Sequence, residues 1–177
     1  MGSDMARIDA VVLVGHGGVP RDYPRERLVR LKALESSRRA QGKEPSAEES
    51  ALAAEIRGWP RTPETDPYQA GLEQLATHLG PLVAPARLVL AYNEFCGPSL
   101  DEAVAGALVD GLGRVVVVPS MLTPGGVHSE IEIPEMIGAL RRRFPNASID
   151  YAWPFDTRAV ATLLAAQAFL RSGGRDE

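Results

Sequence analysis

Short, continuously apolar runs rich in β-branched residues constrain the fold of this chain more than any other feature. Two of them, Val11–Val14 and Val115–Val118, are typical of strands buried on both faces of a sheet. Further strand patterns occur at Ala86–Asn93 and Ala147–Trp153, and segments with helical spacing separate all of them. This alternation predicts an α/β fold, a doubly wound parallel four-stranded sheet with right-handed crossovers.

The connection after the first strand is longer than one crossover requires. Between about residues 20 and 82 it contains three helical patterns, near Leu28–Leu34, behind a candidate N-cap at Ser46, and over Tyr68–Leu79. We therefore expect a helical insertion after the first strand, packed beside or over the functional site. Later helices are expected from about Pro98 to Gly113, from Glu130 to Phe144 and from Thr157 to Arg171.

The length and charge of the chain limit what it can be. Its 177 residues suffice for one domain with a substantial core, so we predict a single domain over residues 1–177, with loose ends at Met1–Met5 and Gly173–Glu177. A formal net charge of −4 and a pI near 5.5 give no reason to expect nucleic-acid or membrane partners. Cys96 is the sole cysteine, which excludes an intrachain disulfide and favours a reduced, cytoplasmic protein.

Three strand patterns lead into side chains that can bind a metal ion. His16 follows the first strand, Glu94 follows the second, and His128 lies in the loop after the third. In an open parallel sheet, ligands bind beyond the carboxyl ends of the strands, so these three residues can converge on one site. Two imidazoles and a carboxylate suit a transition metal, and they can also transfer protons near neutral pH.

Glycines accompany both histidines. Gly17–Gly18 follow His16 and allow a sharp turn that leaves its imidazole accessible. Gly125–Gly126 precede His128, which lies near the start of a helix where Glu132, four residues on, can orient the ring. A phosphate-binding loop is the competing interpretation of the first glycine cluster, but neither the dinucleotide-binding nor the P-loop glycine spacing is present.

Structural interpretations compete with functional ones at several of these residues. Glu94 could equally be a solvated carboxylate at a turn. Cys96 is more typical of a small buried hydrophobe and is left out of the site. His78 falls late in a predicted helix, where it complements the helix dipole, and no chemistry is expected of it. Arg21, five residues after His16, is placed to meet an anionic substrate.

Three blocks of the chain carry a resemblance to a known family. They are Val11–Gly17, then Ala91–Glu94 with Pro98–Leu100, then Val115–Pro119 followed by Pro124–Gly126 and His128–Pro134. In these blocks the sequence resembles the CbiX/SirB class II chelatases, which insert a metal ion into sirohydrochlorin. The likeness covers Ile8–Gly18 and Leu82–Leu170, and its most specific part is the last block.

The resemblance implies a single chelatase-like lobe in which His16, Glu94 and His128 are catalytic residues and metal ligands. The divalent metal (Co²⁺, Fe²⁺ or Ni²⁺) would be a substrate, and the product would serve cobalamin- or siroheme-type cofactor biosynthesis. No organic cofactor is expected. The residues expected to contact the tetrapyrrole are Gly17, Gly18, Arg21, Gly125 and Gly126. Larger family members carry two lobes around a cleft, so a one-lobe chain is expected to form a homodimer. A separate physical possibility is that the inserted helices supply the missing wall.

Departures from the family pattern leave a second interpretation open. Gly18-Val19 stands where many relatives have a serine followed by a basic residue, Val127 adds a residue before His128, and the insertion has no counterpart in the shortest members. These departures favour, as the alternative, a carrier that binds tetrapyrrole or metal without catalysing their union. A phosphoryl-transfer enzyme with His16 as nucleophile is a third hypothesis, disfavoured because no arginine stands beside that histidine.

Overall fold

The computed structural model describes residues 7–111 and 113–172, and in this part of the chain four parallel strands form a sheet in the order β2-β1-β3-β4. The strands are β1 (Ala10–Gly15), β2 (Arg87–Tyr92), β3 (Arg114–Pro119) and β4 (Ser148–Tyr151). The helices are α1 (Arg25–Gln41), α2 (Ala47–Arg57), α3 (Pro67–Val83), α4 (Leu100–Val109), α5 (Ile133–Arg143) and α6 (Thr157–Ser172). The predicted parallel α/β fold is confirmed. The expected loose ends lie outside the described residues.

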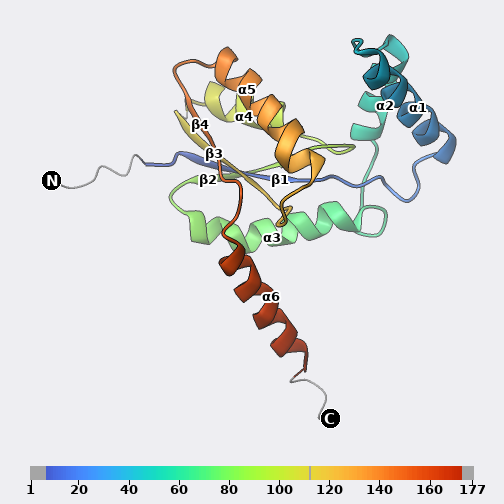
Figure 1. The fold of residues 1–177 in the computed structure, drawn as a ribbon. Helices are drawn as coiled ribbons and strands as arrows, with labels where there is room; N and C mark the ends of the chain where they lie inside the picture. The colour runs from blue at the N-terminus through green and yellow to red at the C-terminus, as the bar shows by residue number, and fades with distance from the viewer. Residues whose placement is uncertain (1–6, 112, 173–177) are drawn as a thin grey trace.

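Helices cover both faces of the sheet (Figure 1). On one face, Val12 of β1 packs with Val104 of α4 and Ile137 of α5 in the main core. Side chains alternate along a strand, so Leu13 points to the opposite face, where it packs against Leu72 of α3. Burial on both faces explains why β1 is apolar throughout rather than alternating.

The order of the strands determines where the loops meet. β1 is flanked by β2 and β3, with Gly15 opposite Tyr92 and Val14 opposite Pro119. Parallel neighbours with this register end at the same edge of the sheet, so the loops that follow β1, β2 and β3 emerge side by side.

Helices α1 and α2 form a pair, called here the inserted hairpin, beyond the carboxyl ends of the strands (Figure 1). Leu31 of α1 and Ile56 of α2 are each 1% exposed and form a small core with Tyr23. A partly buried ion pair, Arg38 to Glu49 at 2.7 Å, joins the two helices. Because α3 packs against β1 and β2, the long connection contains both an ordinary crossover helix and the inserted hairpin. The predicted helical insertion is confirmed.

The helical segment between β3 and β4 begins earlier than the sequence predicts. A turn of π-helix, η1 (His128–Glu132), precedes α5 and continues directly into it, and the Ile133 N–H donates to the His128 carbonyl. Pro134 has no N–H to donate to the carbonyl four residues before it, so the narrower α-helical ladder cannot form there. Apolar spacing over so few residues does not distinguish the two helix types.

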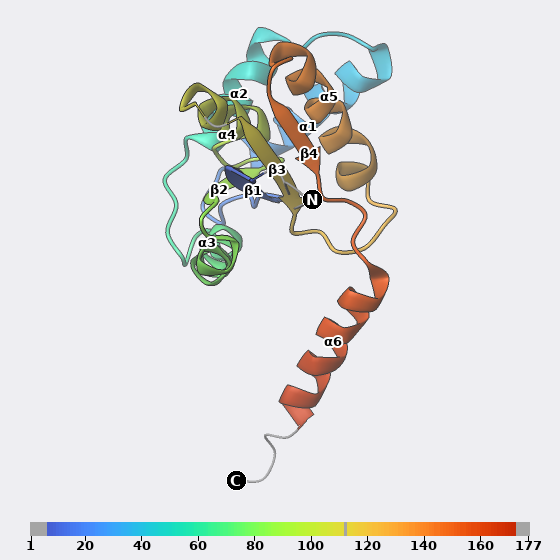
Figure 2. The same cartoon turned by 90° about the vertical axis from the view of Figure 1, so that its left-hand side faces the viewer.

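Helix α6 extends away from the sheet in both views (Figures 1 and 2). Three of its leucines, Leu163, Leu164 and Leu170, are 58%, 59% and 74% exposed. Val116 and Val118 of β3 are only partly buried. The molecule therefore presents apolar surface on α6 and near β3. None of the described helices combines the length and apolar character needed to cross a membrane.

Candidate metal centre

The three predicted ligands lie together at the carboxyl edge of the sheet. The ligand atoms offered by His16, Glu94 and His128 are all within 4.8 Å of one another, and each residue is partly buried. The two imidazole rings make an edge contact, with centroids 4.6 Å apart and planes at 87°. The strand order produces this cluster, because the loops after β1 and β2 meet the start of η1. The catalytic role of these residues stays a prediction.

A local hydrogen bond determines which nitrogen of His16 is available. Its Nδ1 lies 2.8 Å from the Gly17 carbonyl oxygen, which can only accept, so Nδ1 carries the proton and donates it. The lone pair of Nε2 is then free to bind a metal ion. The backbone N–H of His16 donates to the Tyr68 hydroxyl at 2.7 Å, which fixes this loop to the start of α3.

A carboxylate sets the tautomer of His128. Its Nδ1 lies 2.7 Å from both Glu132 Oε2 and the side-chain nitrogen of Asn93. Because the ionised carboxylate can only accept, it favours a proton on Nδ1, which leaves Nε2 free. The Asn93 side-chain N–H donates to the same oxygen at 2.9 Å. Burial alone would raise the pKa of Glu132, but hydrogen bonds from Asn93 and His128 outweigh it and lower that pKa. Glu132 therefore stays ionised and orients the imidazole of His128.

Glu94 is held both by its own loop and by the inserted hairpin. Its backbone N–H donates to the His16 carbonyl at 2.8 Å, so two of the candidate ligands are joined through the main chain. Its Oε2 lies 3.4 Å from Lys32 Nζ, and the same ammonium lies 4.4 Å from the centre of the Phe95 ring. The Lys32 side chain is 46% exposed, so this long ion pair contributes little to stability and is easily exchanged.

Close packing explains the two glycines after His16. A Cβ on Gly17 would lie 1.8 Å from the Glu94 carbonyl oxygen, and the φ of Gly17 is +95°. A Cβ on Gly18 would lie 2.9 Å from Asp66 Oδ1 and 3.2 Å from Tyr68 Cβ. The start of α3 thus occupies the space that a side chain at Gly18 would need.

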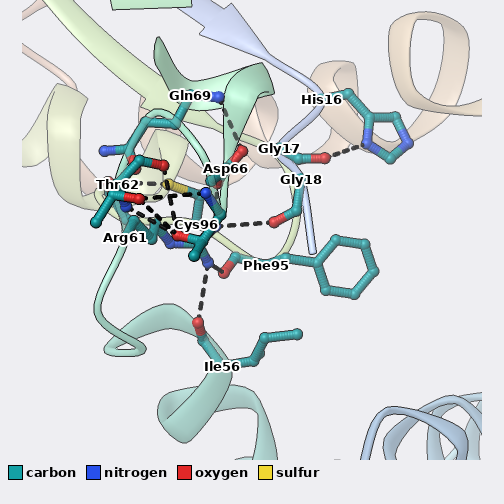
Figure 3. A network of polar contacts seen from close by, with 12 residues as sticks. His16, Gly17, Gly18, Ile56, Arg61, Thr62, Asp66, Gln69, Phe95 and Cys96 are labelled. Carbon is teal, nitrogen blue, oxygen red and sulfur yellow. Dashed lines mark hydrogen bonds and ion pairs between the residues drawn. The ribbon is translucent and has the colours of Figure 1, made fainter. Parts of the chain in front are cut away.

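A buried arginine fastens the site to the inserted hairpin (Figure 3). The side chain of Arg61 is 8% exposed and is paired with Asp66. It also donates to three backbone carbonyl oxygens, those of Gly18, Ile56 and Phe95. One guanidinium therefore joins the loop after β1, the loop after β2 and the end of α2. Figure 3 shows the imidazole of His16 pointing away from this network.

The other residues expected to contact substrate have partners within their own loops or in the turn before α3. The Arg21 guanidinium donates to the Glu64 carbonyl at 3.3 Å, on the turn before α3, rather than to any of the three ligands. Gly125 adopts a left-handed φ of +94°, and its N–H donates to Glu130 Oε1 at 3.1 Å. The Gly126 carbonyl accepts a hydrogen bond from the Glu130 N–H. The glycine pair thus shapes the loop that leads into η1.

Two residues left out of the predicted site have ordinary surroundings. Cys96 is 2% exposed, and burial raises the pKa of its thiol, which keeps it protonated and a poor metal ligand. His78 is exposed on α3.

The spacing of the three ligand atoms allows them to bind one metal ion together. Two nitrogen ligands of a tetrahedral ion lie about 3.3 Å apart when each metal–nitrogen bond is about 2.0 Å. The ligand atoms of His16, Glu94 and His128 lie within 4.8 Å of one another, so small movements of the side chains bring them to such distances. Two imidazoles and one carboxylate suit first-row ions such as Co²⁺, Fe²⁺ and Ni²⁺.

Comparison with known proteins points to one family. The CbiX family model matches residues 64–170. The sirohydrochlorin cobaltochelatase of Priestia megaterium is 30% identical over 82 residues, and that of Methanopyrus kandleri is 33% identical over 67 residues. These stretches cover 46% and 38% of this chain, and 26% and 46% of the two relatives. The chain therefore spans less than half the length of the curated relatives it matches.

A solved structure shares the fold. A protein of Marinobacter aquaeolei VT8, described as a CbiX protein of cobalamin (vitamin B12) biosynthesis, superposes with a TM-score of 0.53 at 20% identity. The match covers 92% of this chain and 98% of that one. The family model begins at residue 64, just before α3, so the inserted hairpin lies outside the region that it matches.

Proposed function

The chain belongs to the CbiX family, and we propose that it is a chelatase that inserts Co²⁺, Fe²⁺ or Ni²⁺ into a sirohydrochlorin-type tetrapyrrole. The observation that carries this proposal is the convergence of His16, Glu94 and His128 at one edge of the sheet. Each imidazole has its Nδ1 engaged, so both offer Nε2 to the same ion. Such a reaction would serve the biosynthesis of cobalamin- or siroheme-type cofactors.

The proposed reaction exchanges metal–protein bonds for metal–macrocycle bonds. Two pyrrole N–H protons leave the ring as two nitrogen–metal bonds form, and the ion loses its protein ligands. Glu94 is the group best placed to accept one proton, because its carboxylate adjoins the ion and its partner Lys32 is exchangeable. An imidazole Nε2 that has released the metal can accept the other. A sparse set of ligands favours this transfer, since an ion bound by many groups would not leave.

A carrier that binds tetrapyrrole or metal without joining them is the second candidate. The features that favour it are the departures from the family pattern, namely Gly18-Val19, the added Val127 and the inserted hairpin. Turnover distinguishes the two functions.

The test is to mix the purified protein anaerobically with sirohydrochlorin and each metal ion in turn, and to follow the absorbance of the metallated ring. We expect insertion faster than in protein-free solution, and a loss of at least about 100-fold in His16→Ala and His128→Ala. His78→Ala is the matched control, since it removes an exposed imidazole far along α3 and should retain full activity. Insertion no faster than without protein, with every metal, would eliminate the chelatase proposal. Stoichiometric binding without turnover would favour the carrier.

We also propose that the chain works as a homodimer in the cytoplasm. The exposed leucines Leu163, Leu164 and Leu170 of α6 support an interface between copies. A single buried thiol, Cys96, is consistent with a reducing compartment. Nothing in the charge of the chain calls for a nucleic-acid or membrane partner.

A further inference from the structure

The inserted hairpin forms one wall of a pocket whose other wall contains Glu94, one of the three candidate ligands. This pocket, of about 260 Å³, is lined by Arg39 and Arg57 from the hairpin and by Glu94, Phe95 and Glu132 from the site loops and η1. The buried Arg61 network holds the two walls in register, because it joins the end of α2 to the loop after β2 (Figure 3).

The size of the pocket limits what can enter it. Sites that enclose a whole drug-sized ligand measure about 300–1,000 Å³, and a tetrapyrrole is at least that large. A space of about 260 Å³ beside the ligands is too small for a macrocycle. It suits one flexible arm of the ring, and the arms of a sirohydrochlorin-type ring end in carboxylates.

The guanidinium groups of Arg39 and Arg57 have N–H groups available to bind a ligand. Arg39 Nη2 lies 3.2 Å from Glu132 Oε1, and its side chain is 57% exposed, so the contact is a weak, exchangeable one. Arg57 donates through Nε to the Ala53 carbonyl of its own helix at 3.2 Å. Among the described residues its guanidinium forms no ion pair within 4 Å, although it lies near enough to Glu102 of α4 to contribute to the lowered pKa of that carboxyl. Both arginines can therefore offer the paired N–H groups that bind a carboxylate bidentately.

The charges around the pocket depend on the metal. Three carboxylates and three cations stand there: Glu35, Glu94 and Glu132, with Lys32, Arg39 and Arg57. Their formal charges balance. A divalent ion at the three ligands would make the region positive and would draw Glu94 away from Lys32, which would favour an arriving carboxylate.

We propose that Arg39 and Arg57 of the inserted hairpin anchor a peripheral carboxylate arm of the tetrapyrrole, so that the ring lies over His16, Glu94 and His128. This inference rests on the proposed function for the identity of the ligand. The hairpin that carries both arginines lies outside the region that the CbiX family model matches. Arg39 and Arg57 act by positioning the ring rather than on the reacting atoms.

The direct test is the affinity of the intact protein for metal-free sirohydrochlorin, measured by quenching of the ring's fluorescence. We expect Arg39→Gln and Arg57→Gln each to weaken binding about tenfold, and Arg39→Lys to recover part of the loss. Arg30→Gln is the matched control, because it removes the same charge from α1 at a residue whose partner is Glu48 of α2. It should bind within about twofold of wild type once salt screening is accounted for.

Kinetics separate this positioning role from a structural one. If insertion occurs, Arg39→Gln and Arg57→Gln should raise KM for the tetrapyrrole and leave kcat nearly unchanged. Unaltered thermal unfolding would exclude loss of the hairpin as the cause. Wild-type affinity in both variants, or no binding of sirohydrochlorin by the wild-type protein, would overturn the inference. In another outcome, the wild-type protein binds sirohydrochlorin without ever inserting metal, while the variants bind it more weakly. That result would support the anchor and refute the chelatase proposal.

Discussion

Gly17 is the glycine of the site at which an added side chain would clash most severely. Replacement by alanine would place a Cβ 1.8 Å from the Glu94 carbonyl oxygen, on a backbone with φ of +95°. Real Cβ atoms essentially never approach closer than 3.0 Å, so the loops after β1 and β2 would have to separate by more than 1 Å.

The expected loss of stability has two parts. The positive φ costs an alanine about 1–2 kcal/mol. Separation of the loops would also break the hydrogen bonds from the Glu94 N–H to the His16 carbonyl and from the Asn93 N–H to the Gly15 carbonyl, each worth about 1 kcal/mol. We therefore expect Gly17→Ala to lower the free energy of unfolding by about 3–4 kcal/mol.

Gly125→Ala isolates the first part. Its φ of +94° is nearly that of Gly17, but nothing lies within 4 Å of the added Cβ. Urea unfolding should therefore show a loss of only about 1–2 kcal/mol for this variant. Titration with Co²⁺ should also show weakened metal binding in Gly17→Ala, because His16 and Glu94 move apart. If the two variants lose the same stability within about 0.5 kcal/mol and Gly17→Ala binds Co²⁺ normally, the close approach does not build the site.

Two further predictions concern Glu132 and the exposed leucines of α6. Glu132→Gln should weaken Co²⁺ binding about 10–100-fold, because His128 loses the carboxylate that fixes its tautomer. Folding lowers the pKa of Glu132, so the stability that its carboxylate contributes is complete above the unfolded carboxyl pKa and is lost as the pH falls through the folded pKa. The difference in unfolding free energy between wild type and Glu132→Gln should therefore shrink in acid. A difference that stays constant with pH would contradict the assignment. Replacing Leu163 and Leu164 by serine should shift the protein toward monomer in sedimentation velocity, whereas a wild-type protein already monomeric at micromolar concentration would refute the dimer.

The sheet and the convergence of His16, Glu94 and His128 were predictable because their signals are local. Runs such as Val11–Val14 identify strands buried on both faces, and parallel strands bring the residues after their ends to one edge. His16 and Glu94 could therefore be placed near each other without knowledge of any contact between them. Glu132 was also accessible as a partner of His128, because the four-residue spacing puts both on one helix face.

The contacts that complete the site were not predictable in the same way, because they join segments far apart in the chain. Lys32 meets Glu94 across 62 positions, and Arg61 meets Phe95 across 34. No periodicity relates such pairs, since the packing of the inserted hairpin alone decides them. Asn93 had a usable signal, its place next to Glu94 at a strand end, but its amide carries no charge or metal affinity to mark it.

The claim on which the rest depends is that His16, His128 and Glu94 bind one ion through two Nε2 atoms and a carboxylate oxygen. X-ray absorption at the cobalt edge of the Co²⁺-loaded protein measures this first shell. We predict two imidazole nitrogens among the ligands, one of which disappears in His16→Ala and one in His128→Ala, with no change in His78→Ala. A shell without imidazole, or one that both variants leave intact, would contradict the account.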